Sequence, residues 1–147
     1  MDRNDVTQMV IAAKRSKKIT WPALAKVVGQ SKEWTAAALL GQMAMTQKQA
    51  EAAGKLLKLN SEAVALLQVT PYKGSLGESV PTDPLIYRLY EIVQIYGTSI
   101  KDIIHEEFGD GIMSAIDFDM KIERQPDPKG DRVKITMSGK YLGYKAY

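Results

Sequence analysis

Over residues 116–138 the spacing of apolar residues changes from the helical period of 3.6 to a period of two. This change constrains the fold more than any other feature of the sequence. Apolar and polar residues alternate over 116–123 and again over 133–138, with the turn Pro126-Asp127-Pro128-Lys129-Gly130-Asp131 between them. Such alternation predicts a β-hairpin with one apolar face. Two strands alone are marginal in water, and the sequence contains no third clear strand. We therefore expect another subunit to cover the apolar face of this hairpin.

Two helices are predicted between the central linker and the hairpin. The first is expected over residues 84–96, because Asp83 is a favourable N-cap and a proline follows it at the first helical position. Gly97 is expected to end it. A second helix is expected over residues 99–108, where Ser99 and an aspartate three residues later resemble a capping box. The apolar residues of the first helix predict that much of it is buried.

The N-terminal half predicts five short helices. Each has apolar residues at helical spacing or a favourable cap, and a linker rich in proline and glycine follows at residues 70–84. The fold class is therefore α+β and mainly α, with a five-helix N-terminal domain at residues 1–78 and a C-terminal domain at residues 79–147 that is expected to dimerise. The expected helices are 4–16, a helix capped by Thr20 and ended by Gly29, 32–40 capped by Ser31, a helix capped by Thr46, and a helix from Asn60 or Ser61 to Leu67.

Composition limits the chemistry and the cell compartment. The 147 residues include no cysteine and one histidine, which excludes thiolate and histidine-rich metal sites within one chain. No apolar run approaches the roughly 20 residues of a membrane span, and no signal peptide is recognisable. We expect a cytoplasmic protein that does not bind membranes. Residues 1–80 carry 11 basic and 6 acidic side chains, a net +5, which raises the question of nucleic-acid binding.

Residues 20–41 have the spacing of a helix-turn-helix motif. In the DNA-binding use of this motif the second helix presents donors such as Arg, Asn or Gln to base edges. The second helix here offers one basic side chain, Lys32, beside Glu33, Trp34 and small residues. The sequence therefore favours a packing unit of this shape and disfavours specific DNA binding.

Arg88, Glu91 and Ser114 are the candidate functional residues. Arg88 and Glu91 lie three residues apart and share one helical face among apolar neighbours, which makes them a candidate anion site or a structural ion pair. Ser114 follows two glycines and could donate a hydrogen bond to an anion or simply begin a strand. His105, on the second helix, is interpreted as a surface or interface residue.

The chain resembles the cyanase (cyanate hydratase) family. The resemblance is carried by residues 83–91 (DPLIYRLYE), by residues 107–116 (EFGDGIMSAI) and by residues 133–142 (VKITMSGKYL), with further matches at 36–42. Gly143 departs from the family, which commonly has proline there. This departure affects the expected rigidity of the C-terminal tail and leaves the candidate site intact.

The resemblance implies a bicarbonate-dependent decomposition of cyanate to ammonia and carbon dioxide through carbamate. By similarity Arg88, Glu91 and Ser114 are the catalytic residues, and no metal or organic cofactor is needed, since bicarbonate is a co-substrate. The family forms decamers of five dimers, with interlaced C-terminal strands and active sites between subunits. Two alternatives stay open: a helix-turn-helix transcriptional regulator whose dimerisation domain senses a small anion, and an assembly that has kept the fold and lost the activity.

Overall fold

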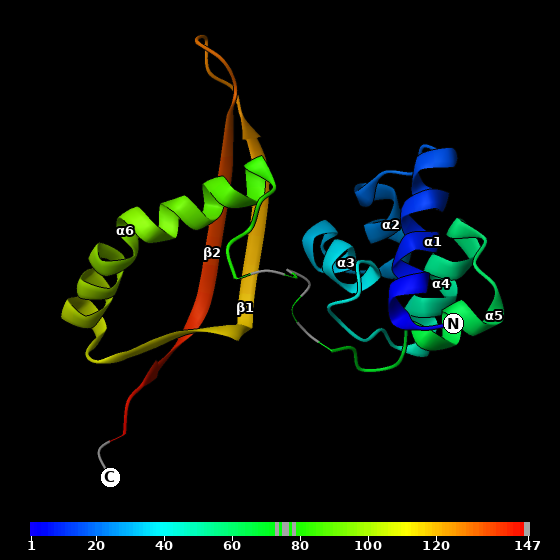
Figure 1. Ribbon diagram of the computed structural model, residues 1–147, viewed down its shortest axis with the longest axis horizontal. Helices are drawn as coiled ribbons and strands as arrows, with labels where there is room; N and C mark the ends of the chain where they lie inside the picture. The colour runs from blue at the N-terminus through cyan, green and yellow to red at the C-terminus, as the bar shows by residue number, and fades with distance from the viewer. Residues whose placement is uncertain (73, 75–76, 78, 146–147) are drawn as a thin grey trace. The chain divides into compact units, whose positions relative to one another are not determined.

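The computed structural model describes residues 1–72, 74, 77 and 79–145. The chain divides into two compact units, Met1–Gly77 and Glu78–Tyr147 (Figure 1). About half of the chain is helical, and the strands form one two-stranded antiparallel sheet, which confirms the α+β class. Of the predicted linker at 70–84, residues 73, 75, 76 and 78 lie outside the described residues.

Unit 1 contains the five predicted helices within its described residues. Each begins at a side chain that accepts a hydrogen bond from the first turn, as the sequence indicated for the last four of them. Thr20 and Ser31 accept from the backbone N–H groups of Ala23 and Trp34, and Gly29 ends its helix in the left-handed conformation at φ +77°. The helices are α1 (Arg3–Ser16), α2 (Trp21–Val28), α3 (Lys32–Leu39), α4 (Gln47–Leu57) and α5 (Ser61–Leu66).

The buried apolar core belongs to unit 1. Its helices meet along their apolar faces, and the largest fully buried side chains come from α1, α2, α3, α4 and the residue that follows α5. Burying a leucine or valine completely contributes about 1.5–3 kcal/mol, so this unit has a stabilising core of its own. The buried apolar residues are Val6, Val10, Leu24, Val28, Ala38, Leu39, Met45, Ala50, Ala53, Leu57, Ala63 and Leu67.

Unit 2 consists of α6 (Pro84–Phe108) followed by the hairpin of β1 (Gly111–Gln125) and β2 (Arg132–Gly143). The predicted break at Gly97 is wrong, because α6 runs without interruption through 25 residues. A glycine inside a helix costs only about 1 kcal/mol, less than ending one helix and starting another. The predicted start at Pro84 with Asp83 as N-cap is confirmed: the Asp83 carboxylate accepts from the N–H groups of Leu85 and Ile86, at 3.0 Å each.

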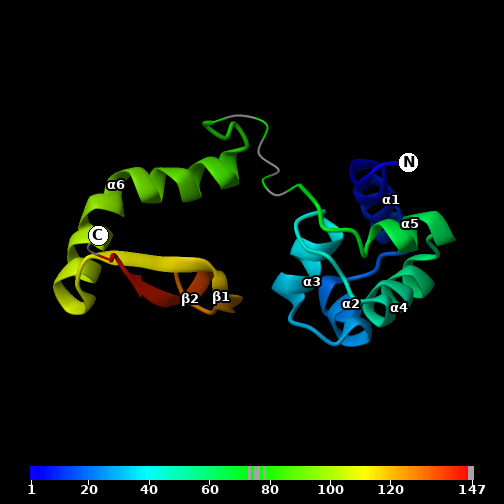
Figure 2. The same ribbon diagram turned by 90° about the horizontal axis from the view of Figure 1, so that it is seen from below.

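The hairpin is longer than the alternation predicted, and it is irregular. β1 and β2 pair in one register from Phe118 to Gln125 and in another from Gly111 to Met113, with an irregularity between Met113 and Phe118. Figure 2 shows α6 over one face of the hairpin, joined to it by the turn that precedes β1. The irregularity interrupts the period of two, which explains why the pattern alone located only the outer part of β1.

Unit 2 leaves many of its large apolar side chains exposed. Among the described residues of α6 and the hairpin, no hydrophobic side chain is buried, and α6 contains no buried residue at all. The prediction that much of α6 is buried is therefore wrong for the single chain, because two strands cannot cover a 25-residue helix. Exposed apolar side chains line both α6 and the hairpin, including Leu85, Val93, Ile103, Ile116 and Val133. An exposed apolar surface of this extent is typical of a protein interface.

Candidate active site

Arg88 and Glu91 lie on the N-terminal half of α6. Arg88 Nε is 3.8 Å from Glu91 Oε2, and the two side chains are 66% and 43% exposed. The Arg88 guanidinium also lies 5.7 Å from the ring centre of Tyr87, within the range of a cation–π contact. The pair is loosely held and accessible, so its charges are available to a ligand or to a neighbouring subunit.

Ser114 lies in the irregular part of β1 and is only 7% exposed. Its Oγ accepts hydrogen bonds from the backbone N–H groups of Ile116, at 3.1 Å, and Asp117, at 2.9 Å. A serine hydroxyl has two acceptor positions and one proton. Because both acceptor positions are used, the hydroxyl can only donate to a further partner, and an anion is a suitable acceptor.

The structure brings two of the three predicted site residues together. Arg88 and Glu91 form a pair, while no hydrogen bond or ion pair among the described residues joins Ser114 to either of them. Within one chain these groups are two separate parts of a candidate anion site.

His105 was predicted at a surface or interface, and it lies partly buried where α6 meets β1. Its Nε2 is 3.0 Å from the Gly111 carbonyl oxygen, and its Nδ1 is 3.3 Å from Asp110 Oδ1. The Asp110 carbonyl in turn accepts from the Tyr141 hydroxyl and from the Tyr144 N–H. His105 therefore fastens the end of α6 to the start of β1, and the Asp110 carbonyl fastens that segment to the end of β2. A lone histidine in a helix pattern did not indicate this role.

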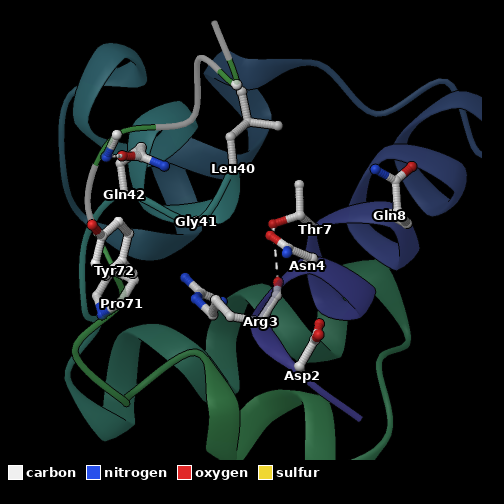
Figure 3. Close-up of a pocket in the computed structure, with 12 residues that line it drawn as sticks. Asp2, Arg3, Asn4, Thr7, Gln8, Leu40, Gly41, Gln42, Pro71 and Tyr72 are labelled. Atoms are coloured by element: carbon white, nitrogen blue, oxygen red, sulfur yellow. Dashed lines mark hydrogen bonds between the residues drawn. The ribbon is translucent and has the colours of Figure 1, made fainter.

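A separate cavity of about 560 Å³ lies in unit 1 (Figure 3). Arg3 forms part of its wall, and Arg3 Nη2 donates to the carbonyl oxygens of Ala38, at 2.6 Å, and Met43, at 3.3 Å. Burial lowers the pKa of the Arg3 guanidinium below its usual value. Arg3 therefore fastens α1 to the end of α3, and the cavity contains none of the predicted site residues.

The helix-turn-helix segment corresponds to α2 and α3. α3 directs Thr35, Ala38 and Leu39 into the core, and Lys32 Nζ lies 2.8 Å from Glu33 Oε1. The basic side chain at the start of α3 is thus partly neutralised. Few donors are left on this helix for base edges.

The residues that the structure describes contain no group of three or more His, Cys, Asp or Glu side chains arranged to hold a metal ion. None of their helices combines the length and the apolar character that crossing a membrane requires.

Comparison with known proteins covers both units. The family model described as "Cyanate hydratase, N-terminal" matches residues 3–71, and that described as "Cyanate lyase C-terminal domain" matches residues 78–146. Curated cyanate hydratases from Ralstonia pickettii (strain 12J) and Polynucleobacter asymbioticus are 63% and 64% identical over 147 residues, with 100% of each chain covered. The crystal structure of cyanase from T. urticae matches with a TM-score of 0.79 and 37% identity, covering 94% of this chain and 96% of that one.

The chain has a helical N-terminal unit, a long uncovered helix and a hairpin. Carbon–nitrogen lyases match this α+β chain over nearly its whole length. The chain belongs to the cyanate lyase (cyanate hydratase) family.

Proposed function

We propose that this protein decomposes cyanate in a bicarbonate-dependent reaction, with Arg88, Glu91 and Ser114 as its catalytic residues. The observation that supports the reaction most strongly is the 63–64% identity, over the whole chain, to two cyanate hydratases. The overall change is one cyanate, one bicarbonate and two protons converted to one ammonia and two carbon dioxide molecules. Bicarbonate adds to cyanate, the dianionic adduct loses carbon dioxide, and the remaining carbamate divides into ammonia and the second carbon dioxide.

The main physical obstacle in this reaction is repulsion between two anions. At about 4 Å two unit charges repel by about 4 kcal/mol at an effective dielectric constant near 20. Arginine stays charged at any relevant pH, and its forked donors match planar, carboxylate-like ions. The accessible Arg88 guanidinium therefore neutralises the paired substrates and the dianionic adduct.

Ser114 supplies a neutral donor beside this charge. Its hydroxyl already accepts two backbone hydrogen bonds, so its single proton is directed to the substrate. Holding the two reactants in the correct orientation is itself worth several kcal/mol. No covalent intermediate with the protein is required.

Glu91 cannot attract an anion, so its function differs from that of Arg88. It either holds the guanidinium in place, through the contact at 3.8 Å, or transfers one of the two protons that the reaction consumes.

In this scheme the protein uses no metal and no organic cofactor, because Arg88 and Ser114 provide the charge and the donors. Dialysis against a chelator should leave turnover unchanged.

We also propose that the active form is an oligomer in which neighbouring subunits bring Ser114 and Arg88 together. The exposed apolar side chains of α6 and of the hairpin support this, because no hydrophobic side chain is buried among the described residues of these elements. Family resemblance favours a decamer of five dimers with interlaced C-terminal strands. Analytical ultracentrifugation tests both points, and a stable monomer would contradict them.

A cytoplasmic location stays a prediction from the cysteine-free sequence.

Ammonia release from cyanate, measured in solution freed of carbon dioxide and then with bicarbonate added back, tests the reaction. We expect release that depends on bicarbonate and yields two carbon dioxide molecules per ammonia. Release at the same rate without bicarbonate would contradict the mechanism, and no release in either case would favour the assembly without activity.

The alternative regulator is tested by DNA retention at low and high salt. Tight retention of one sequence at physiological salt would favour it.

A further inference from the structure

The part of β1 that contains Ser114 departs from regular pairing with β2. Met113 pairs with Tyr141 and Phe118 pairs with Gly139, so residues 114–117 lie opposite Lys140 alone. A bulge bends its strand and changes the direction of its side chains, and bulges are frequent beside active sites. The direction of the Ser114 hydroxyl therefore depends on what holds residues 114–117, which we call the Ser114 bulge, in place.

One constraint on the Ser114 bulge is internal. The two hydrogen bonds from Ile116 and Asp117 to Ser114 Oγ fix the serine side chain relative to the turn of the bulge. They do not fix the bulge relative to β2. A second contact, between the two strands, is needed to set where the hydroxyl proton is directed.

Gly139 provides that second contact. A Cβ atom at this position would lie 2.5 Å from Met113 Cγ and much closer to the Ser114 carbonyl oxygen than van der Waals contact allows. The end of a flexible side chain can move away from such a contact at small cost, whereas a backbone carbonyl in a paired strand cannot. The φ angle of Gly139 is outside the left-handed region, so the position requires glycine for space and not for backbone conformation.

We propose that Gly139 is a positioning residue for the reaction: its missing side chain lets the peptide of Ser114 lie against β2, and this directs the Ser114 hydroxyl at the bound anion. The inference rests on the proposed function of Ser114. Gly139 itself touches neither substrate. Any side chain at residue 139 would push the Ser114 bulge away from β2 and turn the donor from its acceptor.

The first test compares Gly139→Ala with Gly77→Ala. A misplacement of about 1 Å can reduce the rate about 100-fold, so we expect Gly139→Ala to lower kcat at least tenfold per folded oligomer. Gly77 is the control, because it belongs to unit 1 and a Cβ atom there would meet nothing within 4 Å. A merely structural role for Gly139 would reduce the yield of folded oligomer and leave the kcat of the remaining oligomer unchanged. That outcome would overturn the proposal.

A double-mutant cycle with Ser114→Ala then asks whether Gly139 acts through the serine. We expect Ser114→Ala and the Ser114→Ala/Gly139→Ala double variant to have the same kcat within about twofold. A further large decrease in the double variant would show an independent effect of Gly139 and overturn the proposal. The failures are distinguishable: normal turnover of Ser114→Ala contradicts the proposed function of the serine, whereas an impaired Ser114→Ala with a normal Gly139→Ala contradicts only this inference.

If Gly139→Ala does not assemble, Met113→Ala/Gly139→Ala replaces it. Removing Cγ and Sδ of Met113 removes one of the two clashes and keeps the one with the Ser114 carbonyl oxygen. We expect this double variant to assemble with kcat still at least tenfold lower than that of Met113→Ala alone. Full turnover would overturn the proposal, as would failure to assemble when Met113→Ala alone assembles.

Discussion

Arg88 and Glu91 face each other across one turn of α6, with Arg88 Nε 3.8 Å from Glu91 Oε2, at a place where the helix is uncovered within its own chain. An exposed pair of this kind contributes only about 0–1 kcal/mol to stability. Either residue can therefore be replaced without unfolding the subunit. Variants at these positions report on function separately from folding.

Removing the guanidinium should abolish turnover. Arg88→Ala is expected to lower kcat/KM for cyanate at least 100-fold, because the paired anions lose the charge that offsets their repulsion. Sedimentation velocity should show an intact oligomer. Arg88→Lys should recover only part of the activity, since a lysine ammonium lacks the forked donors.

Arg124 offers a matched control for this experiment. It is also an exposed arginine paired with a carboxylate, with Arg124 Nη1 3.0 Å from Asp131 Oδ2 near the hairpin turn. Arg124→Ala should keep normal turnover. Equal losses in Arg88→Ala and Arg124→Ala would point to a general charge effect and against an anion site at Arg88.

Glu91→Gln tests proton transfer. The amide keeps the size and hydrogen-bonding capacity of the carboxylate but cannot exchange a proton, so we expect kcat to fall about 100-fold or more with little change in KM. Glu106→Gln, an exposed glutamate on the same helix, is the control and should be unaffected. If Glu91→Gln mainly raises KM, Glu91 acts by orienting Arg88.

The sequence predicted unit 1 well because each of its signals is local. Thr20, Ser31 and Thr46 mark helix starts through contacts within one turn, and the structure places caps at all three. Unit 2 was predicted less accurately because its decisive contacts join distant residues. The Ser114 bulge depends on the pairing of Met113 with Tyr141, which lie 28 residues apart. Whether the helix continues through Gly97 depends on the helical residues on both sides of it and not on the glycine alone. The burial of α6 was predicted from apolar content, which does not say which chain covers it.

An acidic substitution on the apolar surface of α6 should weaken assembly. Val93→Asp places a carboxylate among exposed apolar side chains that we expect another subunit to bury, and burying an unpaired charge is strongly unfavourable. Sedimentation velocity should show smaller species, and activity should fall with them. Val69→Asp, which changes an exposed valine in unit 1, is the control. An unchanged oligomer in Val93→Asp would mean that α6 faces solvent in the assembly.

The glycines paired at the inner end of the hairpin should differ in tolerance. A Cβ atom at Gly111 would lie 2.7 Å from Tyr141 Cε2 and 2.9 Å from Gly143 Cα, whereas the atoms nearest to one at Gly143 would be Tyr141 ring and hydroxyl atoms at 3.4–3.8 Å. Gly111→Ala should therefore lower the melting temperature by several degrees, and Gly143→Ala should not. Equal changes in melting temperature would show that these positions need glycine for its backbone freedom and not for space. A side chain is thus compatible with the structure at residue 143, where the family commonly has proline.

Arg3 should stabilise unit 1 through hydrogen bonds. Its Nη2 joins α1 to the carbonyl oxygens of Ala38 and Met43, while its Nε and Nη1 are buried without a hydrogen-bond partner in the described part of the chain. Burial opposes the charge and lowers the pKa of the guanidinium, so the net contribution is smaller than two charged hydrogen bonds would suggest.

We expect Arg3→Ala to reduce the free energy of unfolding of unit 1 by about 1–2 kcal/mol. Urea denaturation followed by tryptophan fluorescence measures this directly, because both tryptophans, Trp21 and Trp34, lie in unit 1. Arg15→Ala removes an exposed arginine from the same helix and should change the unfolding free energy by less than about 0.5 kcal/mol. An increase in the free energy of unfolding for Arg3→Ala would mean that the unpaired buried donors destabilise unit 1 by more than the two hydrogen bonds stabilise it.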